Sequence, residues 1–346
     1  MNKIATPQLL NAESLSPGHW IPSISCHLAS FVTFFLCAFI MIYLSYWLPR
    51  LLPGDFFSTM YGNSDVPLAS NNAETLKSVY AGKDGTLWPF GHYLWSLATL
   101  NWGRSNAFSA PVSQLVMEAL PWTMLLMGSA FLISLVLGAL GGVESAWRRG
   151  QWFDRCLVGA MILLESLPEL VTGVLLLAIF AFKLGWFPVS GADTAYTQGS
   201  FGSSIYDVGK HLVLPLMTLV LAYTPSNFLT MRNAMVMVIG EPYVQTARAK
   251  GLPPWRIRYS HAGRNALLPL ATRMGMRLAF LVTGALVVET LFSYPGMGTL
   301  LFNAIRVRDL PLIQFVVLIS SLVVLAINCL VDIAYAVIDP RTVSKK

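Results

Sequence analysis

The stretch VMVIGEPYVQTARAKGLPPWRIRYSHAGRNALLP, residues 236–269, decides how this chain folds. It is polar and strongly basic and lies between two long apolar runs, so it cannot itself lie in hydrocarbon and must face water. A single acid, Glu241, accompanies five basic residues, Arg248, Lys250, Arg256, Arg258 and Arg264. Because cytoplasmic loops of membrane proteins carry an excess of Lys and Arg, the stretch is predicted to face the cytoplasm.

Two short helices are predicted inside this stretch. The segment from Tyr243 to Lys250 contains no Gly or Pro, Gly251 then ends the helix, and the two prolines 253–254 prevent its continuation. Residues 255–268 alternate basic and apolar side chains at helical spacing, which predicts a second, amphipathic helix. Such a pair of helices could dock on another protein or anchor basic groups at the phospholipid surface, and composition alone does not separate the two.

The composition is that of an integral membrane protein. Of the 346 residues, 55% are hydrophobic and only 12% are charged, whereas charged residues make up about a quarter of an ordinary soluble domain. The net charge of +6 is explained by membrane topology, so no nucleic-acid partner is predicted. Neither the five His nor the four Cys show metal-ligand spacing, so no metal site is predicted. No GxxxxGK[ST] motif occurs, so any ATP must be bound by another chain.

The string YVQTARAKG, followed by RNALLP, resembles the cytoplasmic EAA loop of binding-protein-dependent ABC importer permeases of the dipeptide/oligopeptide/nickel branch. LLPGD, GWFPVSG, HLVLPLMTL, the ET-F-x-x-PG string and a terminal DPR are also typical of that family. Gln245 stands where the general motif has Glu. In the family, the short helix before the motif glycine docks into a cleft on the ATPase subunit. The resemblance therefore implies coupling to an ATPase by Glu241, Tyr243, Thr246, Ala247, Arg248, Ala249, Lys250, Gly251 and Leu252.

The predicted fold is an all-α integral membrane protein with six transmembrane helices, in the type I ABC importer permease architecture. A span needs about 20 apolar residues. The six are expected near 26–48, 119–143, 156–184, 211–234, 270–292 and 311–335. The organisation expected around them is a cytoplasmic tail (1–25), a long extracytoplasmic segment (49–118), a permease core (119–336) with the coupling loop 236–269, and a cytoplasmic C-terminal tail (337–346). Trp95 and Trp102 are predicted to anchor a surface-lying helix in the extracytoplasmic segment.

Two carboxylates fall inside the third predicted span. Glu165 and Glu169 lie one helical turn apart near the expected bilayer midplane. A carboxylate there costs at least ~2.5 kcal/mol, so it should face protein or water. Either the two line the translocation path and meet a cationic group of the solute, or they pair with a neighbouring helix or with backbone groups freed by Pro168.

The segment after the fifth predicted span, GALVVETLFSYPGMG, leads to the outer face. Glu289 is expected to tie this loop to the span. Its neighbours Tyr294, Pro295, Gly296 and Met297 form either a periplasmic gate or a plain turn.

The predicted function is a permease subunit of an ATP-driven, binding-protein-dependent importer in the bacterial inner membrane, without enzymatic activity of its own. The resemblance implies a second permease chain, with a heterodimer favoured, two ATP-binding subunits that hold ATP and Mg, a periplasmic solute-binding protein and the lipid bilayer as partners. Di- or oligopeptides are the first expectation for the solute, with nickel or an opine-type metal–chelator complex as the alternative. A self-sufficient secondary transporter would require an inverted repeat, and an intramembrane enzyme a nucleophile–base or metal constellation. We find neither in the sequence.

Overall fold

The computed structural model describes residues 24–47, 87–99, 102–105, 107–194, 201–267, 269–270 and 285–338. This part is helical apart from turns and one isolated antiparallel bridge between Arg104 and Pro111. The all-α prediction is therefore confirmed for the described residues. The predictions for the N-terminal tail, for LLPGD, for most of the fifth span and for the C-terminal tail fall largely or wholly outside them.

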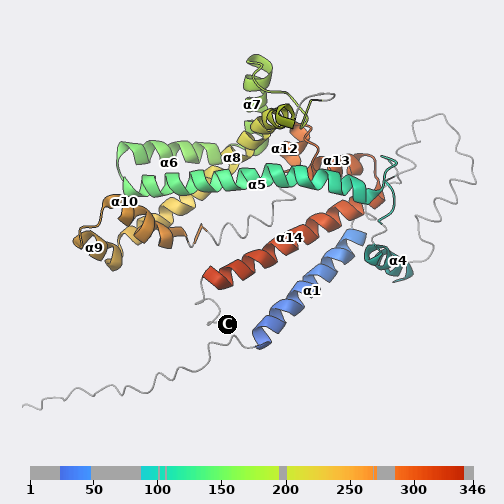
Figure 1. Ribbon diagram of the computed structural model, residues 1–346, viewed down its shortest axis with the longest axis horizontal. Helices are drawn as coiled ribbons and strands as arrows, with labels where there is room; N and C mark the ends of the chain where they lie inside the picture. The colour runs from blue at the N-terminus through green and yellow to red at the C-terminus, as the bar shows by residue number, and fades with distance from the viewer. Residues whose placement is uncertain are drawn as a thin grey trace, which may run out of the picture.

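Among the described residues, three helices are long and apolar enough to cross a membrane: α5 (Val112–Trp147), α8 (Phe201–Ile239) and α14 (Leu310–Ile338). At 1.5 Å per residue, α5 is about 54 Å long and exceeds a ~30 Å hydrocarbon core. Both α5 and α8 extend beyond the predicted spans, and α8 begins ten residues before the expected start of the fourth span at 211. A bent helix pair brings the candidate spans in the described part to at most four. The helix α1 (Ile24–Trp47) runs beside α14 (Figure 1).

Small residues let α5 and α8 pack closely, as the Gly- and Ala-rich sequence of the second span predicts. A Cβ atom on Gly138 would lie 2.9 Å from the backbone nitrogen of Phe228. One on Gly142 would lie 2.8 Å from the Phe228 carbonyl oxygen. Any larger side chain at either position would push the two helices apart, so this pair behaves as one packed unit.

The third predicted span, 156–184, is not one continuous helix. The chain instead forms α6 (Trp152–Glu165), α7 (Glu169–Leu176) and the π-helical η2 (Leu177–Lys183), and the two parts are bent by 99°. Pro168 causes the break because it cannot donate a backbone hydrogen bond and disfavours helical geometry in the residue before it. It stands just before α7 with φ −58° and ψ 142°.

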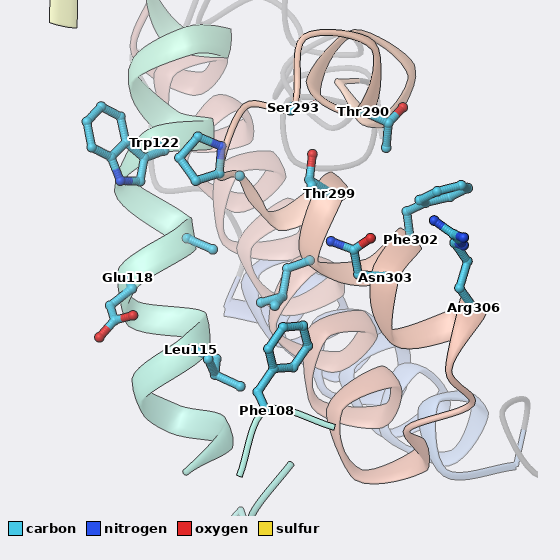
Figure 2. A pocket seen from close by; sticks show the side chains of 14 residues that line it. Phe108, Leu115, Glu118, Trp122, Thr290, Ser293, Thr299, Phe302, Asn303 and Arg306 are labelled. Atoms are coloured by element: carbon cyan, nitrogen blue, oxygen red, sulfur yellow. The ribbon is translucent and has the colours of Figure 1, made fainter. Parts of the chain in front are cut away.

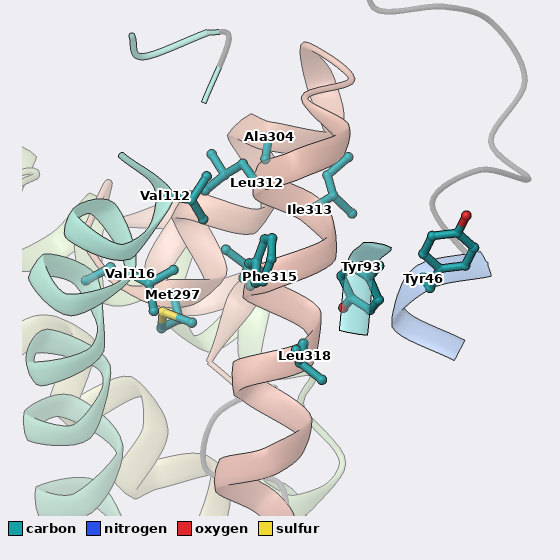
Figure 3. Close-up of a cluster of buried hydrophobic side chains, with 12 residues drawn as sticks. Tyr46, Tyr93, Val112, Val116, Met297, Ala304, Leu312, Ile313, Phe315 and Leu318 are labelled. Carbon is teal, nitrogen blue, oxygen red and sulfur yellow. The ribbon is translucent and has the colours of Figure 1, made fainter. Parts of the chain in front are cut away.

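Three short helices lie at the end of the molecule away from the basic loop. These are α4 (Leu87–Ala98), α12 (Leu286–Leu291) and α13 (Met297–Arg306). Figure 3 shows Phe315 of α14 at the centre of a buried cluster to which α4 and α13 contribute, between Met297 and Tyr93. Trp102, predicted to be an interface anchor, is half-buried, and its ring stacks on Phe315 with centroids 5.4 Å apart. Trp95, by contrast, is 68% exposed.

Candidate functional site

The basic loop after α8 contains the helix α9 (Pro242–Ala249), which begins as its sequence dictates. Glu241 precedes it in an extended conformation, and Pro242 occupies the first helical position, where its missing N–H has no cost. Further on, α10 (Pro254–Arg256) leads into the π-helical η3 (Ile257–Gly263). The predicted helix–turn–helix is therefore present, with π-type geometry in its second member.

Gly251 ends α9 in the left-handed conformation, with φ +72°. Its N–H donates to the Arg248 carbonyl at 2.9 Å, and the N–H of Leu252 donates to the Ala247 carbonyl at 3.4 Å. This is the Schellman pattern of helix termination, in which glycine is preferred because it has no Cβ. No atom lies within 4 Å of where a Cβ on Gly251 would stand. Glycine is therefore required at position 251 because of the backbone conformation, and not because a side chain would lack space.

One face of α9 packs on the rest of the chain and the other is free. Val244 and Ala247 are buried in a cluster with Met235 and Ile257, and Leu252 packs against it. Ala247 therefore positions the helix and has no exposed surface to offer a partner. The other predicted coupling residues are exposed: Glu241, Tyr243, Thr246, Arg248, Ala249, Lys250 and Gly251.

Trp147, the last residue of α5, holds the basic loop to the membrane helices. The guanidinium groups of Arg248 and Arg258 lie 5.2 Å and 5.0 Å from the centroid of its ring. Arg258 also forms an ion pair with Glu144 one turn earlier on α5, and Glu144 in turn pairs with Arg148 at 2.6 Å. Both α9 and η3 are therefore attached to one helix end. Sequence reasoning missed Trp147, although its place beside a cluster of charges at the end of a span was a usable signal.

A buried carboxylate joins three helices at the end of the molecule that carries the basic loop. Asp154 of α6 is 3% exposed and accepts bonds from Arg232 Nε at 2.8 Å and Arg232 Nη2 at 2.9 Å. It also accepts a bond from Ser145 Oγ of α5 at 2.6 Å and one from the Gly150 N–H at 3.0 Å. All these bonds go to one charged group, so the ends of α5, α6 and α8 are fixed relative to one another.

The two predicted midplane carboxylates lie at the break of the third span. Glu165 is the last residue of α6 and is exposed, whereas Glu169 is the first residue of α7 and is half-buried. Within the described residues, neither has an ion pair or a side-chain hydrogen bond. Pairing with a neighbouring helix of the same chain is therefore not observed there.

At the end of the molecule away from the basic loop, Glu289 joins the α12–α13 turn to α5, a helix other than the fifth predicted span to which the sequence assigned this contact. It is fully buried and accepts hydrogen bonds from Thr123 Oγ1 at 2.7 Å and from the N–H groups of Gly298 and Thr299 at 2.7 Å and 3.3 Å. Thr123 Oγ1 accepts a bond from the Met297 N–H at 2.8 Å. The carboxylate thereby satisfies the free amides at the start of α13.

Of the candidate gate residues, Tyr294 and Met297 are buried, and Pro295 is exposed. Tyr294 meets Trp122 edge to face, with centroids 5.8 Å apart. A side chain on Gly296 would collide with the carboxyl group of Glu289. The four residues therefore form a packed turn whose shape depends on Glu289.

Within the described part, no three His, Cys, Asp or Glu side chains gather as a metal site.

The chain is similar in sequence to a family of known proteins. Residues 130–344 match the family model described as binding-protein-dependent transport system inner membrane component. The chain is 36% identical over 319 residues to the di/tripeptide transport system permease protein DppB of Pseudomonas aeruginosa, covering 86% of this chain and 92% of that protein. It is 35% identical over 302 residues to a Brucella abortus protein named as a peptide transport system permease, covering 87% of this chain and 93% of that one.

A solved structure, titled as an inward-facing conformation of the MetNI methionine ABC transporter, has a similar fold. Its TM-score is 0.51 at 16% identity, with 66% of this chain and 98% of that chain covered. At this identity, the similarity concerns the fold alone.

Proposed function

Because this chain belongs to the family of binding-protein-dependent transport system inner membrane components, we propose that it carries short peptides across the bacterial inner membrane. It is a permease subunit of an ABC importer and has no catalytic role of its own. The proposed solute rests on the names of its relatives, which are peptide permeases at 35–36% identity. The proposed partners are a second, different permease chain, two ATP-binding subunits that hold ATP and Mg, and a periplasmic solute-binding protein.

In the proposed arrangement, six helices span the membrane, with both termini and the loop 236–269 in the cytoplasm. The proposed core comprises residues 119–336, and the segment 49–118 lies outside. Support comes from the charge of the loop, which contains five basic residues and one acid.

The exposed face of α9 is the proposed contact with the ATP-binding subunits. The observation that carries this proposal is the division of α9 into two faces: Val244 and Ala247 are buried against the chain, while most of the remaining side chains are free. A helix held on one side and open on the other can transmit the movement of a partner. The proposed coupling set is Glu241, Tyr243, Thr246, Arg248, Ala249, Lys250, Gly251 and Leu252, with Ala247 behind them.

We propose that Glu165 and Glu169, which lie on either side of the break between α6 and α7, line the translocation path. Two carboxylates without partners in the described part of the chain are suited to the ammonium group of a passing peptide. The turn of Tyr294, Pro295, Gly296 and Met297 is the proposed outer gate. Uptake of a dipeptide that is unchanged by Glu165→Gln and Glu169→Gln together would contradict the path.

The test is ATP-driven uptake of radiolabelled dialanine into proteoliposomes that contain the whole importer and its binding protein. Gly251→Asp should abolish uptake and leave membrane insertion intact, because it adds a charge and a Cβ to the end of the docking helix. Gly185→Asp is the matched control, since Gly185 also has positive φ (+64°) and open space around it but lies at the other end of the molecule. Normal uptake by Gly251→Asp would contradict the coupling role. Transport of Ni²⁺ or a metal–chelator complex without any peptide would contradict the proposed solute.

A further inference from the structure

The charged residues near the ends of α5 mark how much of this helix can lie in hydrocarbon. Residues 119–143 carry no charge, and Glu118 and Glu144 stand at either end of this run. At 1.5 Å per residue the run is about 37 Å long, which is enough to cross a ~30 Å hydrocarbon core. Because a carboxylate is costly inside hydrocarbon, Glu144 marks the edge of the core on the side of the basic loop.

The two helical parts of the basic loop lie at different depths relative to this edge. The backbone nitrogen of Arg232 in α8 lies 2.9 Å from where a Cβ on Gly142 would stand, so Arg232 is level with the edge. From there α8 continues to Ile239, about 10 Å further on, before α9 begins. The chain then returns, because Arg258 of η3 forms an ion pair with Glu144. The joined helix α10–η3 therefore lies nearer to the hydrocarbon than the start of α9.

One side of α10–η3 packs on the chain, and another presents aromatic and basic side chains. Ile257 is buried in the cluster that also holds α9. Trp255 is 65% exposed and Tyr259 is 42% exposed, and the two are four residues apart and so share one side of the helix. Arg256 and Arg264 are also exposed, and within the described residues neither has an ion-pair partner. Trp and Tyr are enriched at membrane–water interfaces, and clustered basic residues there bind anionic headgroups.

We propose that Trp255, Arg256, Tyr259 and Arg264 form a binding surface for anionic phospholipids, here called the lipid surface. The two rings lie at the boundary of the hydrocarbon, and the two guanidinium groups pair with headgroup phosphates. Phosphatidylglycerol is favoured over phosphatidylcholine, because the choline group of the latter neutralises its phosphate.

This inference divides the basic loop between two partners. The lipid surface contacts the membrane, and the exposed face of α9 is left to the ATP-binding subunits. The depth of Arg258 at the hydrocarbon edge favours lipid over an ATP-binding subunit as the partner of α10–η3. The inference rests on the proposed membrane arrangement, with α5 as a span, and it does not depend on which solute is carried.

The test measures quenching of Trp255 fluorescence by brominated lipids in bilayers that contain the purified importer complex. The bilayers mix phosphatidylglycerol with phosphatidylcholine, and one of the two lipids is brominated at a time. The signal of Trp255 is the difference between proteins with and without Trp255→Phe. We expect phosphatidylglycerol to associate more strongly than phosphatidylcholine near Trp255.

Each basic residue near an anionic surface strengthens binding about fivefold. Arg256→Gln and Arg264→Gln should therefore each lower the preference for phosphatidylglycerol about fivefold, and Arg256→Lys should retain it. Arg306→Gln is the matched control, because Arg306 is also exposed but lies at the edge of a cavity of about 620 Å³ at the other end of α5 (Figure 2). This variant should keep the full preference.

The inference is overturned if neither lipid quenches Trp255, since protein then covers this surface. Equal association of the two lipids overturns it as well, and so does an equal loss of preference in Arg306→Gln. ATP-driven uptake of dialanine by the wild-type importer tests the proposed function separately. Uptake without the lipid preference rejects the lipid surface alone, and the lipid preference without uptake rejects peptide import alone.

Discussion

Replacing Trp147 with alanine should weaken the link between ATP hydrolysis and transport. The ring lies under two guanidinium groups, those of Arg248 on α9 and Arg258 on η3. Each such contact is worth about 0.5–1 kcal/mol at a partly exposed site, so their joint loss amounts to about 1–2 kcal/mol. Since 1.4 kcal/mol is a factor of ten, the population of α9 held against α5 should fall about 5- to 30-fold relative to the released state.

The assay is the number of dialanine molecules imported per ATP hydrolysed in proteoliposomes that contain the complete importer. For Trp147→Ala we expect this ratio to fall severalfold while ATP hydrolysis persists, because the ATP-binding subunits remain intact. The ion pair between Arg258 and Glu144 survives the substitution, so the loss should be partial.

Trp152→Ala is the matched control. Trp152 lies five residues further along the chain at the same end of the helices and is 76% exposed. The reasoning is refuted if Trp147→Ala imports as many peptides per ATP as the wild type, or if Trp152→Ala loses as much.

Two further predictions concern the buried carboxylates, and both are measured by thermal denaturation of the purified complex. Asp154→Asn should destabilise the joined ends of α5, α6 and α8 by about 3 kcal/mol, because it leaves the Arg232 guanidinium without its bidentate partner. Asp193→Asn, at an exposed position, is the control. Equal melting of the two variants would contradict the assignment. Glu289→Gln should cost about 1.5–3 kcal/mol, because an amide group cannot accept all the bonds that Thr123 and the start of α13 now donate. The exposed Glu118→Gln should melt like the wild type, and a stable Glu289→Gln variant would argue against the proposed hold on the outer turn.

The parts of this structure that were predictable from sequence are those set by local chemistry. Gly251 ends α9 because the chain needs positive φ there, and the two prolines that follow prevent continuation. The glycines of α5 were recognisable as a packing surface because their spacing puts them on one side of a helix. For Glu289, a tie between its loop and a span was predictable, but its contact with Thr123 of α5 was not.

The rest depended on contacts between distant residues. Asp154 and Arg232 are 78 positions apart, and Glu144 and Arg258 are 114 apart, so no local pattern indicates either pair. Pro168 was visible in the sequence, but a proline within a span can bend a helix slightly or break it. Tertiary packing decides between these outcomes. Here Gly173, just after the break, lies so close to Leu291 and Thr218 that a Cβ there would stand 2.6 Å and 3.2 Å from their side chains.

The basic loop and the α12–α13 turn are both attached to α5. A movement of the loop can therefore be passed to the turn through this helix. Trp147 binds the loop, and Thr123 binds Glu289 and the start of α13. The two residues are 24 positions apart on α5, about 36 Å along the axis. Between them, the close contact of Gly138 and Gly142 with α8 prevents α5 from sliding independently. A helix pair packed in this way moves as a body, because stretching α5 would break its own hydrogen bonds. We therefore expect a displacement imposed at Trp147 to reach Thr123, where it would act on the turn that Glu289 holds.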